Sequence, residues 1–484
     1  MICTEKLPVP PILGGAIQTY IAGVLPHLKN QFDITVLGVT DPALPEQETI
    51  DGIQYVRVPG KIFEVYRDNV VQYVQSNKFD LIHIFNRPRL VLPVRNVSPN
   101  TKITLSMHND MFGLEKIGSE EAERVVHEVT QIVTVSDYVG NVIRELYPHA
   151  ANKLRTIYSG VDIQRFLPGN HPRMQKIRQE LRKANGLENK TVILYAGRLS
   201  RNKGVDKLIQ ALPELYKRHK DIALVVVGSN WYSENNVTDY IAYVRAIAKR
   251  TPVPNVSTGF VAPDEVQNWF AAADLFVCTS QWQEPLARVH YEAMAAGLPI
   301  ITTARGGNAE VIQGNGLIVE NPEDPNNFVE TISRILSDKA LMKRMGDKGR
   351  ELASTRYTWE RVAAELRAVW TQAKTAEQVH SNLLPSWKSE TENISQPLIA
   401  EEALQPSGDV AESIQDVVMA QQRDDIASET AIPVEAIAES ETTESTNKRN
   451  KKPFIITGGV LKNSPQPKTV GASRILFLTS HNAR

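Results

Sequence analysis

Short apolar runs rich in Val and Ile alternate along the chain with longer segments whose apolar residues recur at helical spacing. Strands that are apolar throughout and are separated by helices are typical of a parallel sheet covered on both faces. We therefore expect an α/β fold. In the first third of the chain the predicted strands are 33–39, 53–58, 80–85, 102–107, 131–136 and 153–158, and the predicted helices are 16–28 and 136–147.

The alternation stops and then begins again. Residues 166–190 contain Pro, His, Arg and Lys without a regular pattern, so we interpret them as a connection between two domains. Two doubly wound domains that face each other enclose a cleft between the carboxyl ends of their sheets, where open α/β folds bind ligands. The second domain is predicted to contain strands at 192–197, 222–228, 275–280, 299–303 and 316–320, and helices near 204–219, 237–249 and 286–296.

The composition changes after an amphipathic helix predicted at 358–373. Residues 389–446 hold 14 acidic side chains against one basic, Arg423. Such a stretch buries too little apolar surface to offset its chain entropy, so we expect disorder. A basic cluster follows at 448–452, and we hypothesise that this tail tethers the protein to a partner or surface. The expected organisation is a Rossmann-like domain at 1–168, a second at 169–374, and a low-complexity tail at 375–484.

The charge and cysteine content exclude several classes of protein. The 484 residues include 54 Lys and Arg against 55 Asp and Glu, a net charge of −1, so no basic field favours nucleic acid or an anionic membrane. The apolar runs are far shorter than the roughly 18 residues that span a bilayer, and no signal peptide is recognisable. Cys3 and Cys278 cannot form a disulfide framework or a multi-Cys zinc site. We therefore expect a cytoplasmic protein without a nucleic-acid partner or transmembrane segment.

The segment 284–303 carries the clearest candidate site. Pro285 suits the first turn of a helix, which places Glu284 at the N-cap and makes Gly297 the stop. The unpaired N–H groups of such a helix start form an anion site. The residues expected to present them are Leu286, Ala287 and Arg288.

Two glutamates in this segment are eight residues apart, roughly 12 Å along a helix axis. Glu284 and Glu292 are therefore too distant to act as a close carboxylate pair, but they can contact the two ends of one extended ligand. The spacing alone equally allows a simpler interpretation, in which Glu284 is only a cap and Glu292 a solvated helix residue.

Other candidate residues follow predicted strands. Arg198 and Lys203 surround the start of the helix near 204–219, where two cations and backbone donors suit a diphosphate, although a surface turn would look similar. Gly14 and Gly15 precede the first helix, where glycine lets the backbone approach a ligand or simply makes a turn. A second glycine pair lies within 305–311. His108 follows a strand, where a histidine is either structural or catalytic.

Taken together from Gly14 to about Ala373, these features resemble the retaining glycosyltransferase family 4 of the two-domain GT-B type, and most closely its spore coat protein SA-like branch. The pattern E-x7-E is present as Glu284 and Glu292, followed by AMAAGLPII. The pattern A-G-R-x4-K-G begins at Ala196, and GGA stands at 14–16. VSDYV at 135–139 and SGVD at 159–162 support the resemblance.

The resemblance implies a role for each candidate residue. The first domain would hold the acceptor and the second the nucleotide sugar, and the helix at 358–373 would cross back onto the first. Ala287 stands where the family usually has Gly, so the sugar would be held differently there. The implied roles are Glu284 and His108 at the transferred sugar, Glu292 at the ribose hydroxyls, Arg198 and Lys203 at the diphosphate, and Gly14, Gly15, Leu286 and Ala287 in the substrate-binding loops.

The resemblance also implies an activity. Family members move a hexose from a nucleoside-diphosphate sugar to an acceptor with retention of configuration, and they need no cofactor or bound metal. The acceptor is unknown, and the branch suggests spore coat or cell-surface polysaccharide formation. Two alternatives stay open: a structural spore-coat-like protein with a degenerate site, and a sugar-nucleotide epimerase. Most of the expected first strand is missing before Leu7, and ILFLTS at 475–480 has the composition of such a strand.

Overall fold

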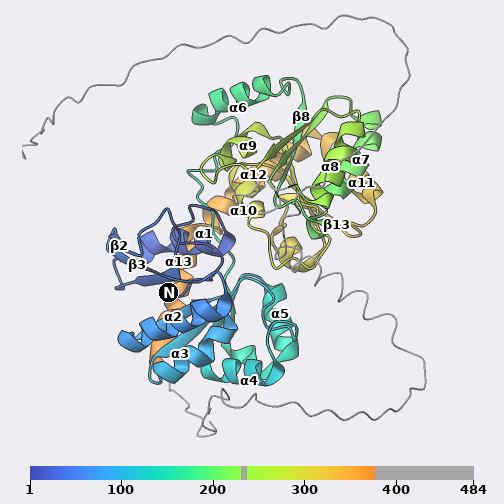
Figure 1. Ribbon diagram of the computed structural model, residues 1–484. Coiled ribbons are helices and arrows are strands. Elements are labelled where there is room, and N and C mark those ends of the chain that lie inside the picture. The colour runs from blue at the N-terminus through green and yellow to red at the C-terminus, as the bar shows by residue number, and fades with distance from the viewer. Residues whose placement is uncertain (230–236, 377–484) are drawn as a thin grey trace, which may run out of the picture. The chain divides into compact units, whose positions relative to one another are not determined.

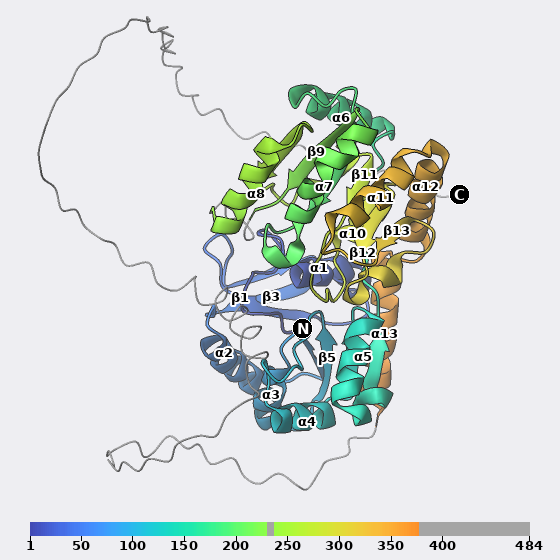
Figure 2. The ribbon, with the colours of Figure 1, turned by 90° about the vertical axis from the view of Figure 1, so that its right-hand side faces the viewer.

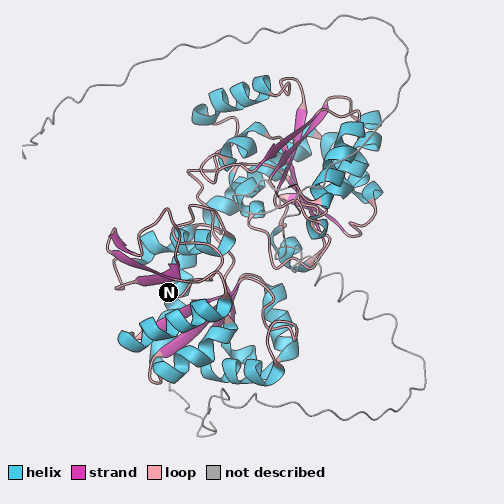
Figure 3. Ribbon diagram, viewed as in Figure 1, coloured by secondary structure: helices cyan, strands magenta, loops and turns pink. Residues whose placement is uncertain are grey.

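The computed structural model describes residues 1–229 and 237–376, and residues 1–384 belong to one compact unit (Figure 1). The predicted acidic stretch, the basic cluster and the candidate strand at 475–480 lie outside the described residues. None of the described helices is long and apolar enough to cross a membrane. The described part contains two sets of parallel strands covered by helices, as the sequence predicted (Figure 3).

The amino-terminal strands form two parallel groups that the first three residues join. Ile2 donates its N–H to the carbonyl of His83, and Cys3 donates to the carbonyl of Leu37, both at 2.8 Å. Residues 1–3 therefore occupy the place of the first strand, and Leu7 already lies in the loop that follows. The parallel strands of the two groups are β1 (Thr35–Val39) and β3 (Ile53–Val58), and then β4 (Leu81–Phe85), β5 (Lys102–Met107), β6 (Gln131–Thr134) and β7 (Leu154–Thr156).

One strand and three helices of this half were not predicted. β2 (Gln47–Ile50) pairs antiparallel with β3 at the edge of the sheet and is largely exposed, so it has no apolar run to reveal it. The predicted helices are confirmed as α1 (Ala16–Leu28) and α5 (Asp137–Leu146). The further helices are α2 (Phe63–Ser76), α3 (Val91–Val97) and α4 (Ser119–Glu128).

The carboxyl-terminal sheet has the order β10-β9-β8-β11-β12-β13, and all its pairs are parallel. The chain order therefore reverses between β8 and β11, which is the point where open α/β sheets bind ligands. Every residue of β9 is buried, as expected for a central strand. The strands are β8 (Thr191–Ala196), β9 (Ile222–Val227), β10 (Asn255–Gly259), β11 (Leu275–Val277), β12 (Ile300–Thr303) and β13 (Gly316–Val319).

Helices cover both faces of this sheet, and two of them adjoin the candidate site (Figure 2). The 3-10 turn η3 (Arg201–Lys203) leads into α7, and α10 follows the segment that begins at Glu284. The helices are α7 (Val205–Arg218), α8 (Asp239–Arg250), α9 (Val266–Ala272), α10 (Val289–Ala295), α11 (Pro325–Leu336) and α12 (Lys339–Thr355).

The segment 166–190, interpreted as a connection between two domains, contains the helix α6 (Pro172–Ala184), which the sequence did not predict. Its sequence is mostly polar and only Met174 and Arg182 are buried, so no broad apolar face marks it. Arg178 and Arg182 both pair with Asp274, which precedes β11, and these contacts fix the helix against the sheet. The tertiary ion pairs, rather than local periodicity, stabilise α6.

The last described helix, α13 (Trp359–Thr375), confirms the helix predicted at 358–373 and packs on α1 of the amino-terminal half. Val362, Leu366 and Trp370 join its core, and the Trp370 indole N–H donates to His83 at 3.2 Å. A Cβ on Gly23 of α1 would lie 2.3 Å from the Trp359 ring, so only glycine permits this close approach. The crossing implied by the resemblance is therefore present.

Candidate functional site

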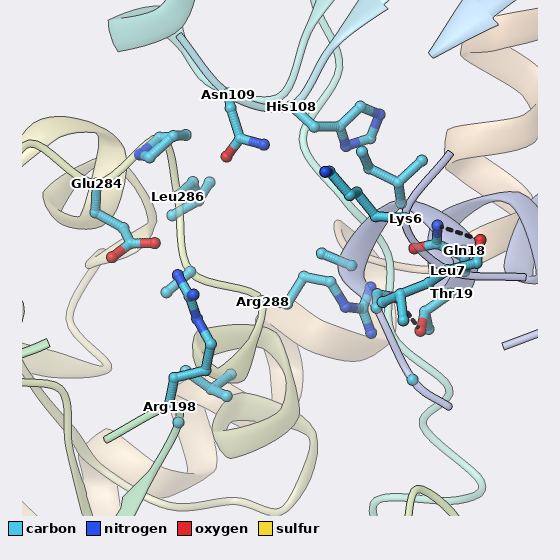
Figure 4. A pocket seen from close by; sticks show the side chains of 18 of the residues that line it. Lys6, Leu7, Gln18, Thr19, His108, Asn109, Arg198, Glu284, Leu286 and Arg288 are labelled. Atoms are coloured by element: carbon cyan, nitrogen blue, oxygen red, sulfur yellow. Dashed lines mark hydrogen bonds between the residues drawn. The ribbon is translucent and has the colours of Figure 1, made fainter. Parts of the chain in front are cut away.

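One cavity of about 890 Å³ is lined by residues of both halves (Figure 4). Loops that follow the carboxyl ends of the parallel strands supply most of its walls. Figure 4 shows Glu284 on one side of the cavity and His108, Lys6 and Gln18 on the other. All the residues predicted for the site line it, namely Gly14, Gly15, His108, Arg198, Lys203, Glu284, Leu286, Ala287 and Glu292.

Glu284 is the most tightly held of these side chains, and only 6% of the residue is exposed. Lys203 Nζ donates to its two carboxylate oxygens at 2.6 and 2.7 Å. Ser280 Oγ and Trp282 Nε1 donate at 2.8 and 2.7 Å. Burial would raise the pKa of this carboxyl, but the Lys203 charge and the hydrogen bonds outweigh burial and hold the pKa below its usual value. Glu284 is therefore ionised in the cavity wall.

The prediction that Glu284 caps a helix is wrong, because α10 begins at Val289. The preceding loop is held by the 3-10 segment η4 (Gly306–Val311). The Gly307 N–H donates to the Glu284 carbonyl at 2.8 Å, and Ala287 donates its N–H to Asn308 Oδ1 at 3.1 Å. The Ala287 N–H already donates to a side chain. The expected anion site, in which three N–H groups at a helix start are unpaired, is therefore wrong.

Gly306 explains the second glycine pair. Its φ of +55° lies in the left-handed region, and a Cβ would come within 2.1 Å of the Glu284 carbonyl oxygen. Glycine is needed here so that η4 can reach the backbone of the Glu284 loop. The pair at 306–307 therefore shapes the site through the backbone, whereas the sequence indicated only a candidate glycine pair after a strand.

Glu292 does not lie unpaired on a solvated helix face. Its carboxylate is 3.3 Å from Nη2 of Arg288, four residues earlier. The Arg288 guanidinium also lies over the Trp359 ring at 5.5 Å and donates to Ser159 Oγ at 3.3 Å. Arg288 thus links the E-x7-E segment to α13, a role that the sequence interpretation did not assign to it.

Arg198 and Lys203 follow β8 at the point where the strand order reverses. The Tyr195 hydroxyl donates to the Arg198 carbonyl at 2.8 Å and fixes the turn. Gly204 ends η3 with φ +64°, and a Cβ there would lie 2.5 Å from the carbonyl oxygen of Thr279. This close approach brings Lys203 to Glu284, so Lys203 contacts the carboxylate as well as lining the cavity.

His108 follows β5, and a buried asparagine shapes its loop. Asn86 Oδ1 accepts the N–H groups of both His108 and Asn109 at 2.9 Å. The His108 ring meets Tyr20 edge to face at 4.9 Å. Burial, aided by the Arg288 charge, lowers the pKa of His108 from 6.5 to about 3. The imidazole is therefore neutral at physiological pH.

The first glycine pair, before α1, is required by local packing as well as being placed to contact a ligand. Gly14 and Gly15 have φ of +85° and +103°. A Cβ on Gly15 would lie 2.3 Å from Gln18 Oε1, and Gln18 donates to the carbonyl of Leu7 at 3.0 Å. Both interpretations of this pair therefore persist: it makes the turn into α1, and it lines the cavity.

The sequence interpretation missed several cavity residues, chiefly basic ones. All but Lys6 follow a predicted strand, so a survey of polar side chains after every predicted strand would have found them, whereas no predicted strand precedes Lys6. Within the described residues, no group of three His, Cys, Asp or Glu side chains could hold a metal ion. The missed residues are Lys6, Arg87, Arg89, Asn109 and Lys116.

Comparison with known families and proteins gives consistent matches along the described chain. The family model "Glycosyltransferase Family 4" matches residues 14–165, and "Glycosyl transferases group 1" matches residues 177–352. Spore coat protein SA of Bacillus subtilis (strain 168) is 41% identical over 372 residues, which are 76% of this chain and 98% of that protein. The putative glycosyltransferase YtcC of the same organism is 40% identical, over 76% of this chain and 90% of its own.

Solved structures share the fold. Anabaena Alr3699/HepE in complex with UDP-glucose superimposes with a TM-score of 0.62 at 19% identity, covering 76% of this chain and 98% of that one. WaaG, a glycosyltransferase involved in lipopolysaccharide biosynthesis, gives a TM-score of 0.58 at 19% identity, covering 75% and 98%. At these identities the likeness establishes the two-domain architecture.

Proposed function

The chain belongs to the GT-B glycosyltransferases, and on that premise we propose that it transfers a hexose from a nucleoside-diphosphate sugar to an acceptor with retention of configuration. The observation that carries the proposal is the ionised, buried carboxylate of Glu284 in a cavity that Arg198, Lys203 and His108 also line. A relative named a GDP-mannose-dependent mannosyltransferase, 30% identical over 289 residues, supports a nucleotide-sugar donor.

The proposed reaction breaks the bond between the anomeric carbon and the diphosphate oxygen. An acceptor hydroxyl forms the new bond from the same face, and its proton passes to the departing phosphate oxygen. Arg198 and Lys203 stabilise the charge that builds on the diphosphate. Glu284 faces the donor sugar and favours the positive charge at its anomeric carbon, while Glu292 binds the ribose hydroxyls.

A neutral His108 suits this scheme. An imidazolium beside the reacting sugar would repel the positive charge developing there. The neutral ring can still hydrogen-bond a sugar hydroxyl, because one ring nitrogen donates and the other accepts. The positive charge in the scheme comes from Arg198, Lys203 and backbone N–H groups, so the proposal includes no metal and no cofactor.

The likeness to spore coat protein SA supports a role in making spore coat or other cell-surface polysaccharide, with the enzyme acting from the cytoplasm. A structural coat protein with a degenerate site predicts the opposite biochemistry. It would bind no nucleotide in the cavity, whereas the contacts of Glu284 with Lys203, Ser280 and Trp282 form an ordered polar site.

Two assays test the proposal. UDP, GDP and ADP are compared in a thermal shift experiment, where a nucleotide at 100 times its dissociation constant adds about 2.7 kcal/mol of stability. The matching UDP-, GDP- or ADP-sugar is then followed for nucleoside diphosphate release. Release supports a transferase, an epimerised sugar nucleotide without release indicates an epimerase, and the absence of both binding and release indicates a structural protein.

A further inference from the structure

Three cations line the cavity on the side opposite Glu284 and have no part in the donor machinery proposed above. They are Lys6, Arg89 and Lys116, and each follows the carboxyl end of a different parallel strand. Lys6 follows residues 1–3, Arg89 follows β4, and Lys116 follows β5. These strands are neighbours, since Ile2 bridges Ile84 and β4 pairs with β5. The fold therefore gathers the three cations at one edge of the sheet.

Nearby carboxylates do not neutralise this group. Glu5 is 3% exposed and accepts two hydrogen bonds from the Arg87 guanidinium, at 2.6 and 2.7 Å, so Arg87 is its nearer cationic partner. Its carboxylate also lies 3.8 Å from the Lys6 ammonium. Among the described residues that the amino-terminal half contributes to the cavity, Glu115 and Asp162 are the other acids. Five cations, including Arg87 and Arg165, thus face three carboxylates in a chain whose net charge is −1.

The three side chains can reach a ligand, although the Lys6 ammonium also lies 3.8 Å from the Glu5 carboxylate. The Lys6 side chain is 60% exposed and extends into the cavity in Figure 4. The Arg89 guanidinium lies over the Phe63 ring at 4.9 Å, which leaves the N–H groups at its edge available for a bidentate anion. Lys116 is exposed, and within residues 1–229 and 237–376 no hydrogen bond or ion pair engages its ammonium.

We propose that Lys6, Arg89 and Lys116 bind a phosphate or carboxylate on the acceptor, so that the acceptor is an anionic saccharide. This proposal rests on the transferase activity proposed above. The donor diphosphate is assigned to Arg198 and Lys203 on the other wall. The cations of the amino-terminal wall would therefore bind a second anion, which the acceptor carries. An anion there offsets the mutual repulsion of the cations and gives charge-assisted hydrogen bonds to each.

The test uses the full chain saturated with whichever nucleoside diphosphate binds it, so that the donor anion site is filled. Calorimetric titrations compare glucose, glucose 6-phosphate and glucuronate, which differ in the presence and kind of anion. The two anionic sugars are expected to bind at least about tenfold more tightly than glucose, since one charge-assisted hydrogen bond is worth that factor or more. The comparison of the two acids separates phosphate from carboxylate recognition.

We expect each single variant, and the triple variant, to weaken binding of the anionic sugars by about tenfold and to leave the affinity for glucose unchanged. The variants are Lys6→Met, Arg89→Met and Lys116→Met. Lys176→Met on α6 is the matched control, because that lysine is 85% exposed and does not line the cavity. Nucleoside diphosphate affinity and melting temperature should stay constant in all variants.

Equal binding of glucose and the two acids, no binding of either acid, or unchanged affinity in the triple variant would each overturn the anionic acceptor. In those cases donor turnover and nucleotide binding by the wild type would still support the transferase. Failure of the wild type to bind any nucleotide would instead defeat the proposed function.

Discussion

At the scale of single residues, the pairing of Lys203 with Glu284 changes what each can do. The resemblance assigned Lys203 to the diphosphate and Glu284 to the sugar, yet their charged atoms are 2.6 Å apart. Both side chains are largely buried, so each charge depends on the other for compensation. Lys203 therefore keeps Glu284 ionised as well as standing at the proposed diphosphate site.

Glu284→Gln should reduce turnover by about 10²–10³, because the variant loses the carboxylate that favours charge at the anomeric carbon. It should also lower the free energy of unfolding by about 3–5 kcal/mol, since Lys203 is left without its buried partner. Nucleoside diphosphate release and urea unfolding measure the two effects.

The double variant Glu284→Gln with Lys203→Met separates these effects. Removing both charges should recover most of the lost stability while turnover stays low. If turnover recovers together with stability, Glu284 acts only through the fold.

His108 should have a stability signature that depends on pH. Burial holds its pKa near 3 in the folded chain, below the ordinary 6.5, so the unfolded chain binds more protons between these values. The stability of the wild type should therefore fall as pH decreases from about 6.5 toward 3. His108→Gln removes this contribution and should flatten that part of the curve, as urea unfolding at pH 7, 6 and 5 would reveal. An identical pH dependence in both proteins would mean that His108 is solvated.

At the scale of elements, η4 joins the Glu284 loop to the amino-terminal half. Its Gly307 and Asn308 hold the loop, as described above, and its Glu310 reaches α5. The Glu310 carboxylate accepts the N–H groups of Asp137 and Tyr138 at 2.9 and 2.8 Å, and the Tyr158 hydroxyl at 2.9 Å. A carboxylate from one half therefore caps a helix of the other, and it fixes the two walls of the cavity together.

Glu310→Ala should lower the free energy of unfolding by about 0.5–2 kcal/mol, the usual cost of losing a helix cap. Turnover should fall as well, because the residues proposed for acceptor and donor lie on opposite halves, while nucleoside diphosphate affinity should stay constant. Glu330→Ala is the control, since Glu330 is 67% exposed and pairs with Arg218 on α7 at the surface. If both variants lose the same amount of stability and turnover, the contact of Glu310 with α5 does not specifically join the two halves.

The elements that the sequence predicted correctly are those with a strong apolar pattern. Most strands of the parallel sheets, together with α1 and α13, are buried along one face or throughout, so periodicity reveals them. β10 was not predicted, because none of its residues is fully buried. The polar elements β2 and α6 escaped because pairing at a sheet edge and ion pairs to Asp274 stabilise them. The start of α10 was misplaced because contacts from η4, distant in sequence, hold the preceding loop extended.

The same division applies to the candidate site. Motif spacing placed all nine predicted residues in one cavity, because loops after parallel strands meet at one edge of each sheet. The pairings within the cavity depend on rotamers and on distant segments. Neither the contact of Lys203 with Glu284 nor that of Arg288 with Trp359 follows from spacing alone.

At the scale of the whole described molecule, the two halves supply walls of positive charge to one cavity. Arg198 and Lys203 lie in a loop that follows a strand of the carboxyl-terminal sheet. Lys6, Arg89 and Lys116 lie in segments that follow strands of the amino-terminal half. Side-chain cations can stabilise a diphosphate leaving group without a divalent ion. The distribution of charge therefore leads to a prediction about metal dependence.

Turnover should persist in EDTA, because the proposed stabilisation of the departing diphosphate comes from Arg198, Lys203 and backbone N–H groups.

Arg198→Met should instead weaken nucleoside diphosphate binding by about 1.5–3 kcal/mol, the usual value of a hydrogen bond to a charged group. The measurement is nucleoside diphosphate release with and without chelator, in wild type and variant. If chelator abolishes release and Mg²⁺ or Mn²⁺ restores it, a bound metal carries the charge that we assign to these side chains. If release is unaffected by chelator but Arg198→Met binds nucleotide normally, backbone donors and Lys203 hold the diphosphate without Arg198.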